Sequence, residues 1–271
     1  MGHDSLDSRK DKIFDLIVRS YVDTAEPVGS RTISRRYDLG LSPASIRNVM
    51  ADLEEQGLLK QPHTSAGRVP TDKGYRYFVD RLMEPEELTE TEKHWVHTEL
   101  GKVRTIEGLV EKVSKIIAKL TENAALIYIK NLKRVSFLNY LLEELIEAEK
   151  LNNFLEEEPE LFIEGVPLVF EQPEFHDLQK MRLLLQAFDE KYNFLQIFVK
   201  DLEEEGVQVH IGRENALGEL EDISLVVKDC YLGGIAIAAV AVVGPTRMRY
   251  SKVVSVVDYV ADSVTEAVRK F

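Results

Sequence analysis

The sequence predicts an α+β protein of two domains, and three observations support this fold class. The chain has 271 residues, more than the roughly 100–200 residues of a usual single domain. Apolar residues recur at helical spacing through the first third of the chain. After about residue 103, helical patterns alternate with short apolar runs of strand length. We expect one domain at 1–83, a linker or connecting helix at 84–102 and an α+β domain at 103–271.

The composition is that of a folded protein in a reducing compartment. Apolar residues make up 44% and charged residues 30% of the chain. The single cysteine, Cys230, cannot form an intramolecular disulfide and leaves no cysteine cluster for a metal, so a cytoplasmic location is expected. Residues Met1–Lys10 are polar, without the apolar stretch of a secretory signal. The longest apolar run, Ile235–Val243, is far shorter than the roughly 20 residues of a membrane-spanning helix and predicts a buried strand.

The charge is divided unevenly along the chain. Residues 1–82 hold 13 basic and 12 acidic residues, a sum of +1, so the overall charge of −13 leaves −14 for the remainder. Residues 27–81 alone hold nine basic and six acidic residues, a sum of +3. This asymmetry is expected if only the N-terminal third approaches nucleic-acid phosphates. Ordinary variation of surface charge explains it equally well.

The first helix is predicted over residues 9–22 by the apolar spacing of Ile13, Leu16, Ile17 and Tyr21. Pro27 interrupts this pattern because proline disfavours helix at the residue before it. We expect Ser30 to act as the N-cap of a short second helix that runs through Tyr37.

A third helix follows a tight turn at Gly40, which can adopt a positive φ. Ser42 and Pro43 have the residue types of an N-cap and a first helical position, and Gly57 can end the helix. The residues expected to be buried in this helix are Ile46, Val49, Met50 and Leu53. Helix, glycine turn and helix make a helix-turn-helix, although a simple helical pair with a polar outer face has the same pattern.

The next residues predict a wing. Segments 58–63 and 69–71 have the pattern of two short strands, joined by the small residues of 64–68. Thr71 and Asp72 then cap a helix over Lys73–Met83. A hairpin directly after the second helix of a helix-turn-helix completes a winged helix-turn-helix.

The residue types on the predicted outer face suit DNA. The second helix of the pair enters the major groove by its N-terminal end, where arginine suits guanine and asparagine suits adenine. Hydroxyl groups and cations at the wing suit phosphate or the minor groove. The candidate DNA-binding residues are Ser30, Arg31, Ser42, Ala44, Ser45, Arg47, Asn48, His63, Thr64, Ser65, Arg68, Thr71, Lys73 and Arg76.

The rest of the chain predicts a sheet flanked by helices. An amphipathic helix is expected over Val103–Asn123. Expected strands are 124–129, 195–199, 207–211, 224–227 and 234–243, and expected helices are 138–154, 175–191 and 250–271. His94 and His97 are three apart, but no further ligand stands nearby, so we interpret them as surface histidines and not as a metal site.

Several long motifs closely resemble the family of the heat-inducible transcription repressor HrcA. At the N-terminal end they are Pro27-Val-Gly-Ser-Arg-Thr32, Tyr37-Asp-Leu-Gly40, Ser42-Pro-Ala-Ser-Ile-Arg-Asn48, Met50-Ala-Asp-Leu-Glu-Glu55, Pro62-His-Thr-Ser-Ala-Gly-Arg68 and Pro70-Thr-Asp-Lys-Gly-Tyr-Arg-Tyr77. Near the other end they are Ile211-Gly-Arg-Glu-Asn215 and Val243-Gly-Pro-Thr-Arg-Met-Arg-Tyr-Ser-Lys-Val253.

The resemblance implies a homodimer that binds an inverted-repeat, CIRCE-type operator and represses heat-shock chaperone operons. It also implies a GAF-like second domain, an inserted dimerisation segment and activity that depends on the chaperonin GroEL. Two features depart from the family. The stretch 129–170 is shorter by several tens of residues, which puts the dimer geometry in doubt, and Arg249 stands where the family usually has Asp.

Other functions receive less support from the residues. The chain has no P-loop, dinucleotide glycine fingerprint, HExxH or nucleophile elbow, so we expect no enzyme and no cofactor. A protein-binding scaffold would expose more apolar surface than the predicted third helix does. A winged-helix regulator that responds to a small molecule stays open. The loop Gly244-Pro-Thr-Arg247 could cradle an anion, but a structural turn in which Arg247 binds carbonyl groups is favoured.

Overall fold

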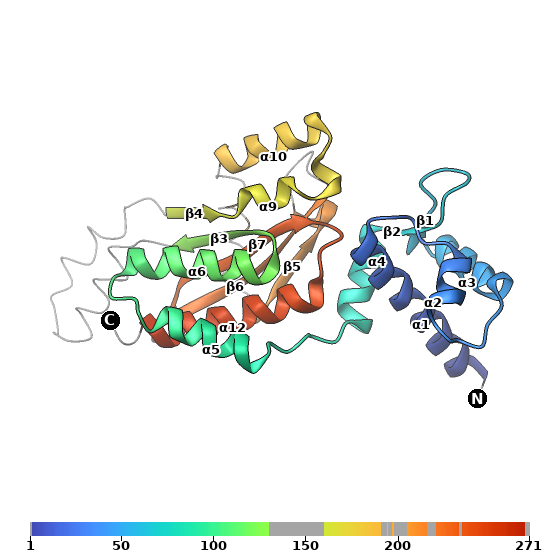
Figure 1. Ribbon diagram of the computed structural model, residues 1–271, viewed down its shortest axis with the longest axis horizontal. Coiled ribbons are helices and arrows are strands. Elements are labelled where there is room, and N and C mark those ends of the chain that lie inside the picture. The colour runs from blue at the N-terminus through green and yellow to red at the C-terminus, as the bar shows by residue number, and fades with distance from the viewer. Residues whose placement is uncertain are drawn as a thin grey trace. The chain divides into compact units, whose positions relative to one another are not determined.

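The computed structural model describes residues 2–129, 160–190, 194, 197, 205–215, 221–232 and 235–268. Figure 1 traces these residues, which form two compact units. The first unit consists of Met1–Pro85 together with Thr246–Ser251, and the second of Glu86–Pro245 together with Lys252–Phe271. The helix predicted over 138–154 lies outside the described residues.

The first unit is a winged helix-turn-helix, as the sequence predicts. Its elements are α1 (Gly2–Thr24), α2 (Ser30–Arg36), α3 (Pro43–Glu55), β1 (Leu59–Lys60), β2 (Val69–Pro70), α4 (Asp72–Tyr77) and the π-helical turn η1 (Phe78–Leu82). Strands β1 and β2 pair antiparallel, with Leu59 opposite Pro70. Each of α1, α2 and α3 contributes fully buried side chains to the core, among them Phe14, Ile33 and Ile46.

The local signals at Gly40, Ser42, Gly57 and Thr71 are confirmed. Ser42 caps α3, because its hydroxyl accepts a hydrogen bond of 3.1 Å from the Ser45 amide, and Pro43 follows in the first turn. Gly40 and Gly57 adopt φ angles of +62° and +73°, in the left-handed region where glycine is favoured. Thr71 caps α4 by accepting a hydrogen bond of 3.0 Å from the Gly74 amide.

The predicted N-cap at Ser30 is wrong by one residue. Gly29 occupies the cap position of α2, in an extended conformation with φ −92° and ψ 150°, and Ser30 is the buried first residue of the helix. The displacement has a tertiary cause. Val28 exchanges two backbone hydrogen bonds of 2.9 Å with Arg68, and this bridge sets where the chain can turn into the helix.

The second unit contains a five-stranded antiparallel sheet in the order β4-β3-β7-β6-β5. Its strands are β3 (Ala124–Ile129), β4 (Glu160–Glu164), β5 (Gln208–Ile211), β6 (Ile223–Leu232) and β7 (Ile235–Pro245). The prediction of strands at 124–129, 207–211, 224–227 and 234–243 is confirmed, although β6 extends further than expected. Strand β4 was not predicted.

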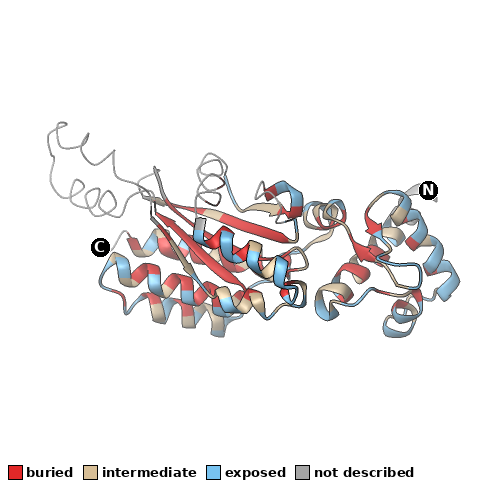
Figure 2. Ribbon diagram, turned by 90° about the horizontal axis from the view of Figure 1, so that it is seen from above, coloured by how far each residue is buried: buried red, intermediate tan, exposed pale blue. Residues whose placement is uncertain are grey.

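Helices cover both faces of this sheet. Helices α9 (Val166–Phe170) and α10 (Leu178–Glu190), with the 3-10 turn Pro173–Phe175 between them, pack on the face that carries Leu126 and Leu225. Helices α6 (Ile106–Thr121) and α12 (Tyr250–Val268) cover the face that carries Ile127 and Val240. Neighbouring strand residues point to opposite faces, so β3 is buried along its whole length, as the red strands of Figure 2 show.

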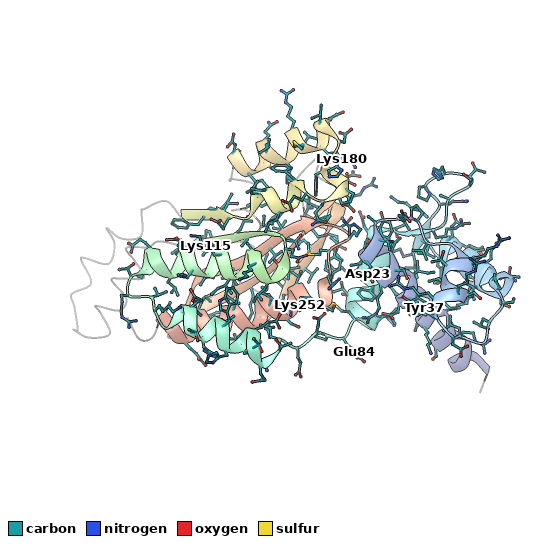
Figure 3. All side chains as sticks on the ribbon, in the orientation of Figure 1. Asp23, Tyr37, Glu84, Lys115, Lys180 and Lys252 are labelled. Carbon is teal, nitrogen blue, oxygen red and sulfur yellow. The ribbon has the colours of Figure 1, made fainter. Side chains whose placement is uncertain are left out.

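Helix α5 (Glu90–Leu100) belongs to this second unit and is not only a connection. Lys252 of α12, labelled in Figure 3, lies 2.6 Å from the Glu92 carboxylate of α5. The hydrogen bond from Lys252 lowers the pKa of Glu92 below its ordinary value, so the contact favours the charged carboxylate.

The strand predicted over 195–199 is wrong at Ile197. Ile197, the described residue in this range, is helical, and so is Phe194. Both side chains are buried and stand three positions apart, which is a helical repeat. A short apolar run does not distinguish a strand from a buried helix by its pattern alone, which explains the error. No helix among the described residues is long and apolar enough to cross a membrane.

Candidate nucleic-acid interface

The start of α2, residues Arg47 and Met50 of α3 and the wing border a shallow concavity of about 440 Å³. The predicted DNA-binding residues that line it are Ser30, Arg31, Arg47, Thr64, Ser65 and Arg68. The other candidates lie outside this lining. The fold therefore brings residues from three separate segments of the sequence to one polar surface.

The start of α3 presents the residues expected to reach base edges. Ser45, Arg47 and Asn48 are exposed on its first turns, while Ile46 points inward and is fully buried. The cap at Ser42 holds the start of the helix, since Ser42 Oγ also lies 3.0 Å from Ser45 Oγ. The positive end of the helix dipole lies at this terminus and favours an anion such as phosphate.

The wing tip is exposed to solvent, and hydrogen bonds within the hairpin fix its conformation. His63, Thr64 and Ser65 are exposed. The Gln61 amide donates hydrogen bonds of 2.9 Å to the Thr64 carbonyl and 3.0 Å to the Ala66 carbonyl, which closes the turn. Gln61 also lines the concavity. Gln61 was not among the predicted DNA-binding residues, because a single glutamine after a short strand resembles an ordinary surface residue.

Arg68 stands at the base of the wing and contacts α3. Its guanidinium Nε and Nη2 donate to Oε2 of Glu54, at 2.9 Å and 2.8 Å. Its neighbour Gly67 has no room for a side chain, because a Cβ there would lie 2.4 Å from the carbonyl carbon and oxygen of Val28. Glu54 was likewise not among the predicted site residues, and only the fold reveals its role.

Three of the candidate DNA-binding residues have partners within the unit. Thr71 donates through its hydroxyl to the Gly57 carbonyl at 2.6 Å. Lys73 donates to the Gln56 carbonyl at 2.8 Å, and Arg76 pairs with Asp80 at 3.1 Å. A DNA phosphate would have to share or replace these partners, and the role of the three residues in DNA binding stays a prediction.

The loop after β7 has the structural role that the sequence analysis favoured. Arg247 donates a hydrogen bond of 2.8 Å to the Val22 carbonyl at the end of α1. Arg249 lies 3.4 Å from Asp23, which is labelled in Figure 3. Met248 and Tyr250, on either side of Arg249, are buried.

The described part of the second unit contains an open pocket of about 480 Å³, lined in part by His97, Arg104, Ser263 and Glu266. Between α6, α12 and the sheet lies an apolar cavity of about 30 Å³, about the size of a single water. Burial raises the pKa of the Cys230 thiol that lines it, so the thiol stays protonated. His97 shares a hydrogen bond of 2.8 Å with Tyr259, and the described residues contain no group of three or more potential metal ligands.

The fold and the exposed surface of the first unit define a class: a winged-helix transcription regulator with an α+β second domain. Residues 128–254 match the family model of the HrcA protein C terminal domain. The chain is 32% identical to the heat-inducible transcription repressor HrcA of Desulfitobacterium hafniense, over 96% of this chain and 97% of that protein. It is 33% identical to the HrcA of Symbiobacterium thermophilum, over 98% of this chain and 100% of that protein. The chain therefore belongs to the HrcA family of heat-inducible transcription repressors.

The fold is similar to that of a solved structure, and the chain is shorter than its alignment with a relative. The crystal structure of a hypothetical protein at 2.2 Å resolution matches the fold with a TM-score of 0.69 and 22% identity, over 97% of this chain and 98% of the other. The alignment with the Desulfitobacterium hafniense repressor spans 337 positions, whereas this chain has 271 residues. At least 337 − 271 = 66 positions of that alignment are therefore gaps in this chain.

Proposed function

We propose that this repressor binds an inverted-repeat operator of the CIRCE type as a homodimer and that GroEL modulates its activity. Family membership supports the operator, the dimer and the chaperonin input. The observation that carries DNA binding by this surface is the meeting of α2, α3 and the wing around one concavity that holds Arg31, Arg47 and Arg68. The proposed location is the cytoplasm.

In the proposed complex each copy places the start of α3 in a major groove. Ser42, Ala44 and Ser45 approach the backbone and base edges, Arg47 reads guanine and Asn48 reads adenine. The wing tip, His63 to Ser65, lies along the flanking backbone or minor groove. The remaining residues near phosphates are Ser30, Arg31, Thr71, Lys73 and Arg76.

Two-fold symmetry of the operator would mirror two-fold symmetry of the protein. A dimer with two such helices contacts two half-sites, and the spacing of those half-sites follows from the dimer geometry. The shortened stretch between 129 and 170 makes the oligomeric state a necessary measurement. Sedimentation of the full chain at micromolar concentration decides it, and a monomer with no operator preference would contradict the proposal.

The principal experiment is fluorescence anisotropy with a labelled inverted-repeat duplex and a scrambled duplex at one fixed salt concentration. We expect tight binding to the repeat, weaker binding to the scrambled duplex and strengthening by added GroEL. Equal and weak binding to both duplexes would refute the operator. Operator binding that GroEL leaves unchanged would refute the chaperonin input alone.

Variants of α3 test the docking. Arg47→Ala and Asn48→Ala should each lose about 1–3 kcal/mol of binding free energy on the operator and relax the base preference at one position. Arg76→Ala should weaken binding to the operator and the scrambled duplex by the same factor, because a phosphate contact carries no sequence information. If both α3 variants keep the full operator preference, α3 is not the reading helix.

A further inference from the structure

We infer that Glu54 and Arg68 form a clasp that positions the wing against α3, and that Arg68 acts on DNA binding through this clasp and not as a phosphate contact. The inference rests on the proposed function, in which α3 and the wing bind the operator together. It assigns Glu54 and Arg68 as positioning residues, and it gives Arg68 a role different from the one its charge and its place in the wing suggest.

The side-chain geometry is the first support. Two nitrogens of the Arg68 guanidinium, Nε and Nη2, converge on one Glu54 oxygen at 2.9 Å and 2.8 Å. The Arg68 side chain is 20% exposed and the Glu54 side chain 36% exposed. A pair that is partly withdrawn from water is screened less by salt than a fully exposed pair. The Arg68 charge is thus largely balanced within the protein.

The backbone supplies the second support. Arg68 and Val28 exchange two hydrogen bonds of 2.9 Å, so the base of the wing is also fixed to the loop before α2. Gly67 makes this approach possible, because any side chain at that position would overlap the Val28 carbonyl. Arg68 is therefore held by its backbone to one segment and by its side chain to the recognition helix.

The position of the wing tip depends on the end of the hairpin that Arg68 fixes. Gln61 fastens the tip from within by donating to the Thr64 and Ala66 carbonyls, at 2.9 Å and 3.0 Å. β1 and β2 are only two residues long each, so the strand pairing alone provides few hydrogen bonds. The clasp adds the side-chain link between the hairpin and α3, and it fixes where Thr64 and Ser65 lie relative to Arg47.

The two possible roles of Arg68 predict opposite effects of a Glu54 substitution on operator binding. If the pair is a clasp, removal of the Glu54 charge frees the wing and weakens operator binding. If Arg68 is a phosphate contact, Glu54 competes with the phosphate for the guanidinium, and its removal strengthens binding. Arg68→Gln weakens binding under both roles. Only a phosphate contact, however, lowers the slope of log Kd against log salt by about 1 when Arg68 is removed.

The experiment compares full-length Glu54→Gln, Arg68→Gln, Arg68→Lys and the double variant Glu54→Gln/Arg68→Gln. Glu55→Gln is the matched control, because Glu55 is the exposed next residue of α3 and the substitution removes the same charge. Operator affinity is measured by anisotropy over a series of salt concentrations. Thermal unfolding of each variant identifies any that fail to fold, and amide hydrogen exchange is followed across residues 59–70.

A clasp predicts that Glu54→Gln and Arg68→Gln each weaken operator binding by about tenfold, as expected for coupled contacting residues. The double variant is then no weaker than the worse single variant, and the salt slope stays that of the unaltered protein. Arg68→Lys keeps the charge but loses the forked contact, so it also weakens binding. Hydrogen exchange in the wing speeds up in these variants and not in Glu55→Gln.

Tighter operator binding by Glu54→Gln, or a salt slope lowered by about 1 in Arg68→Gln, would overturn the clasp and leave the proposed function intact. Unchanged wing exchange in Glu54→Gln would also overturn it. If the unaltered protein shows no operator preference, the proposed function fails, and the exchange measurement still decides whether the clasp holds the wing.

Discussion

The guanidinium of Arg247 donates a 2.8 Å hydrogen bond to the Val22 carbonyl, although the two residues lie 225 positions apart in the sequence. Val22 lies in the last turn of α1, where carbonyl groups have no partner within the helix. Nearby, the Tyr250 ring packs on Tyr75 with centroids 5.8 Å apart. Segment Thr246–Ser251 is therefore an integral part of the winged-helix unit.

Arg247→Gln should lower the free energy of unfolding of this unit by about 1–2 kcal/mol, because a charged donor to an otherwise unpaired helix carbonyl is lost. Arg249→Gln is the matched control. The Arg249 side chain is 62% exposed, and its contact with Asp23 is a long ion pair of 3.4 Å at the surface. Loss of this contact should therefore lower the free energy of unfolding by less than about 0.5 kcal/mol. Urea unfolding, with hydrogen exchange across α1, measures both. Equal effects would contradict a special role for Arg247.

Gly67→Ala should destabilise the wing. The new Cβ would lie 2.4 Å from the Val28 carbonyl group, so the bridge between Val28 and Arg68 must separate. Overpacking of this kind costs about 1–3 kcal/mol. Amide exchange at Val28 and Arg68 should accelerate strongly while exchange in the α6 helix is unchanged. Full protection of both amides in the variant would mean that the loop can shift without losing its pairing.

Low pH should weaken the ion pairs that Glu99, near the end of α5, forms with Lys102 and Lys112. Hydrogen bonds from Lys102 and Lys112 lower the pKa of Glu99 from 4.5 to about 2. A lowered folded pKa stabilises the fold above the unfolded value and loses that contribution as the pH falls through the folded value. Glu99→Gln should therefore flatten the fall in melting temperature between about pH 4.5 and pH 2. The same acid profile with and without the substitution would contradict the assigned pKa.

Two leucine substitutions should separate core from surface in the second unit. Leu126 of β3 is fully buried within the helix-covered face of the sheet, whereas Leu178 of α10 is 80% exposed. Leu126→Ala should cost about 2–5 kcal/mol, since it removes buried methyl groups and leaves a cavity. Leu178→Ala should change stability by less than about 0.5 kcal/mol. Denaturant unfolding measures both effects. A large loss of stability for Leu178→Ala would indicate that the Leu178 side chain is buried against another surface in solution.

Most of the fold was predictable because its signals are local. Ser42 with Pro43, Thr71 before Asp72 and the positive φ of Gly57 act within one helical turn, so each is visible in a short stretch of sequence. Strand β3 was predicted residue for residue, since an apolar run ending in Tyr128 and Ile129 suits a buried strand. The strand predicted at Ile197 was wrong, because a short apolar run is equally compatible with a strand and with a buried helix.

The sequence by itself determined the order of the helices, the wing, the central strands and the residue types of the surface proposed to face DNA, because periodicity, caps and turn residues act between near neighbours. Tertiary structure alone decided that Arg68 pairs with Glu54, that Gly29 and not Ser30 is the N-cap of α2, and that Thr246–Ser251 joins the winged-helix unit. Each of these depends on groups far apart along the chain. Their meeting is set by packing of the whole unit, which no local pattern encodes.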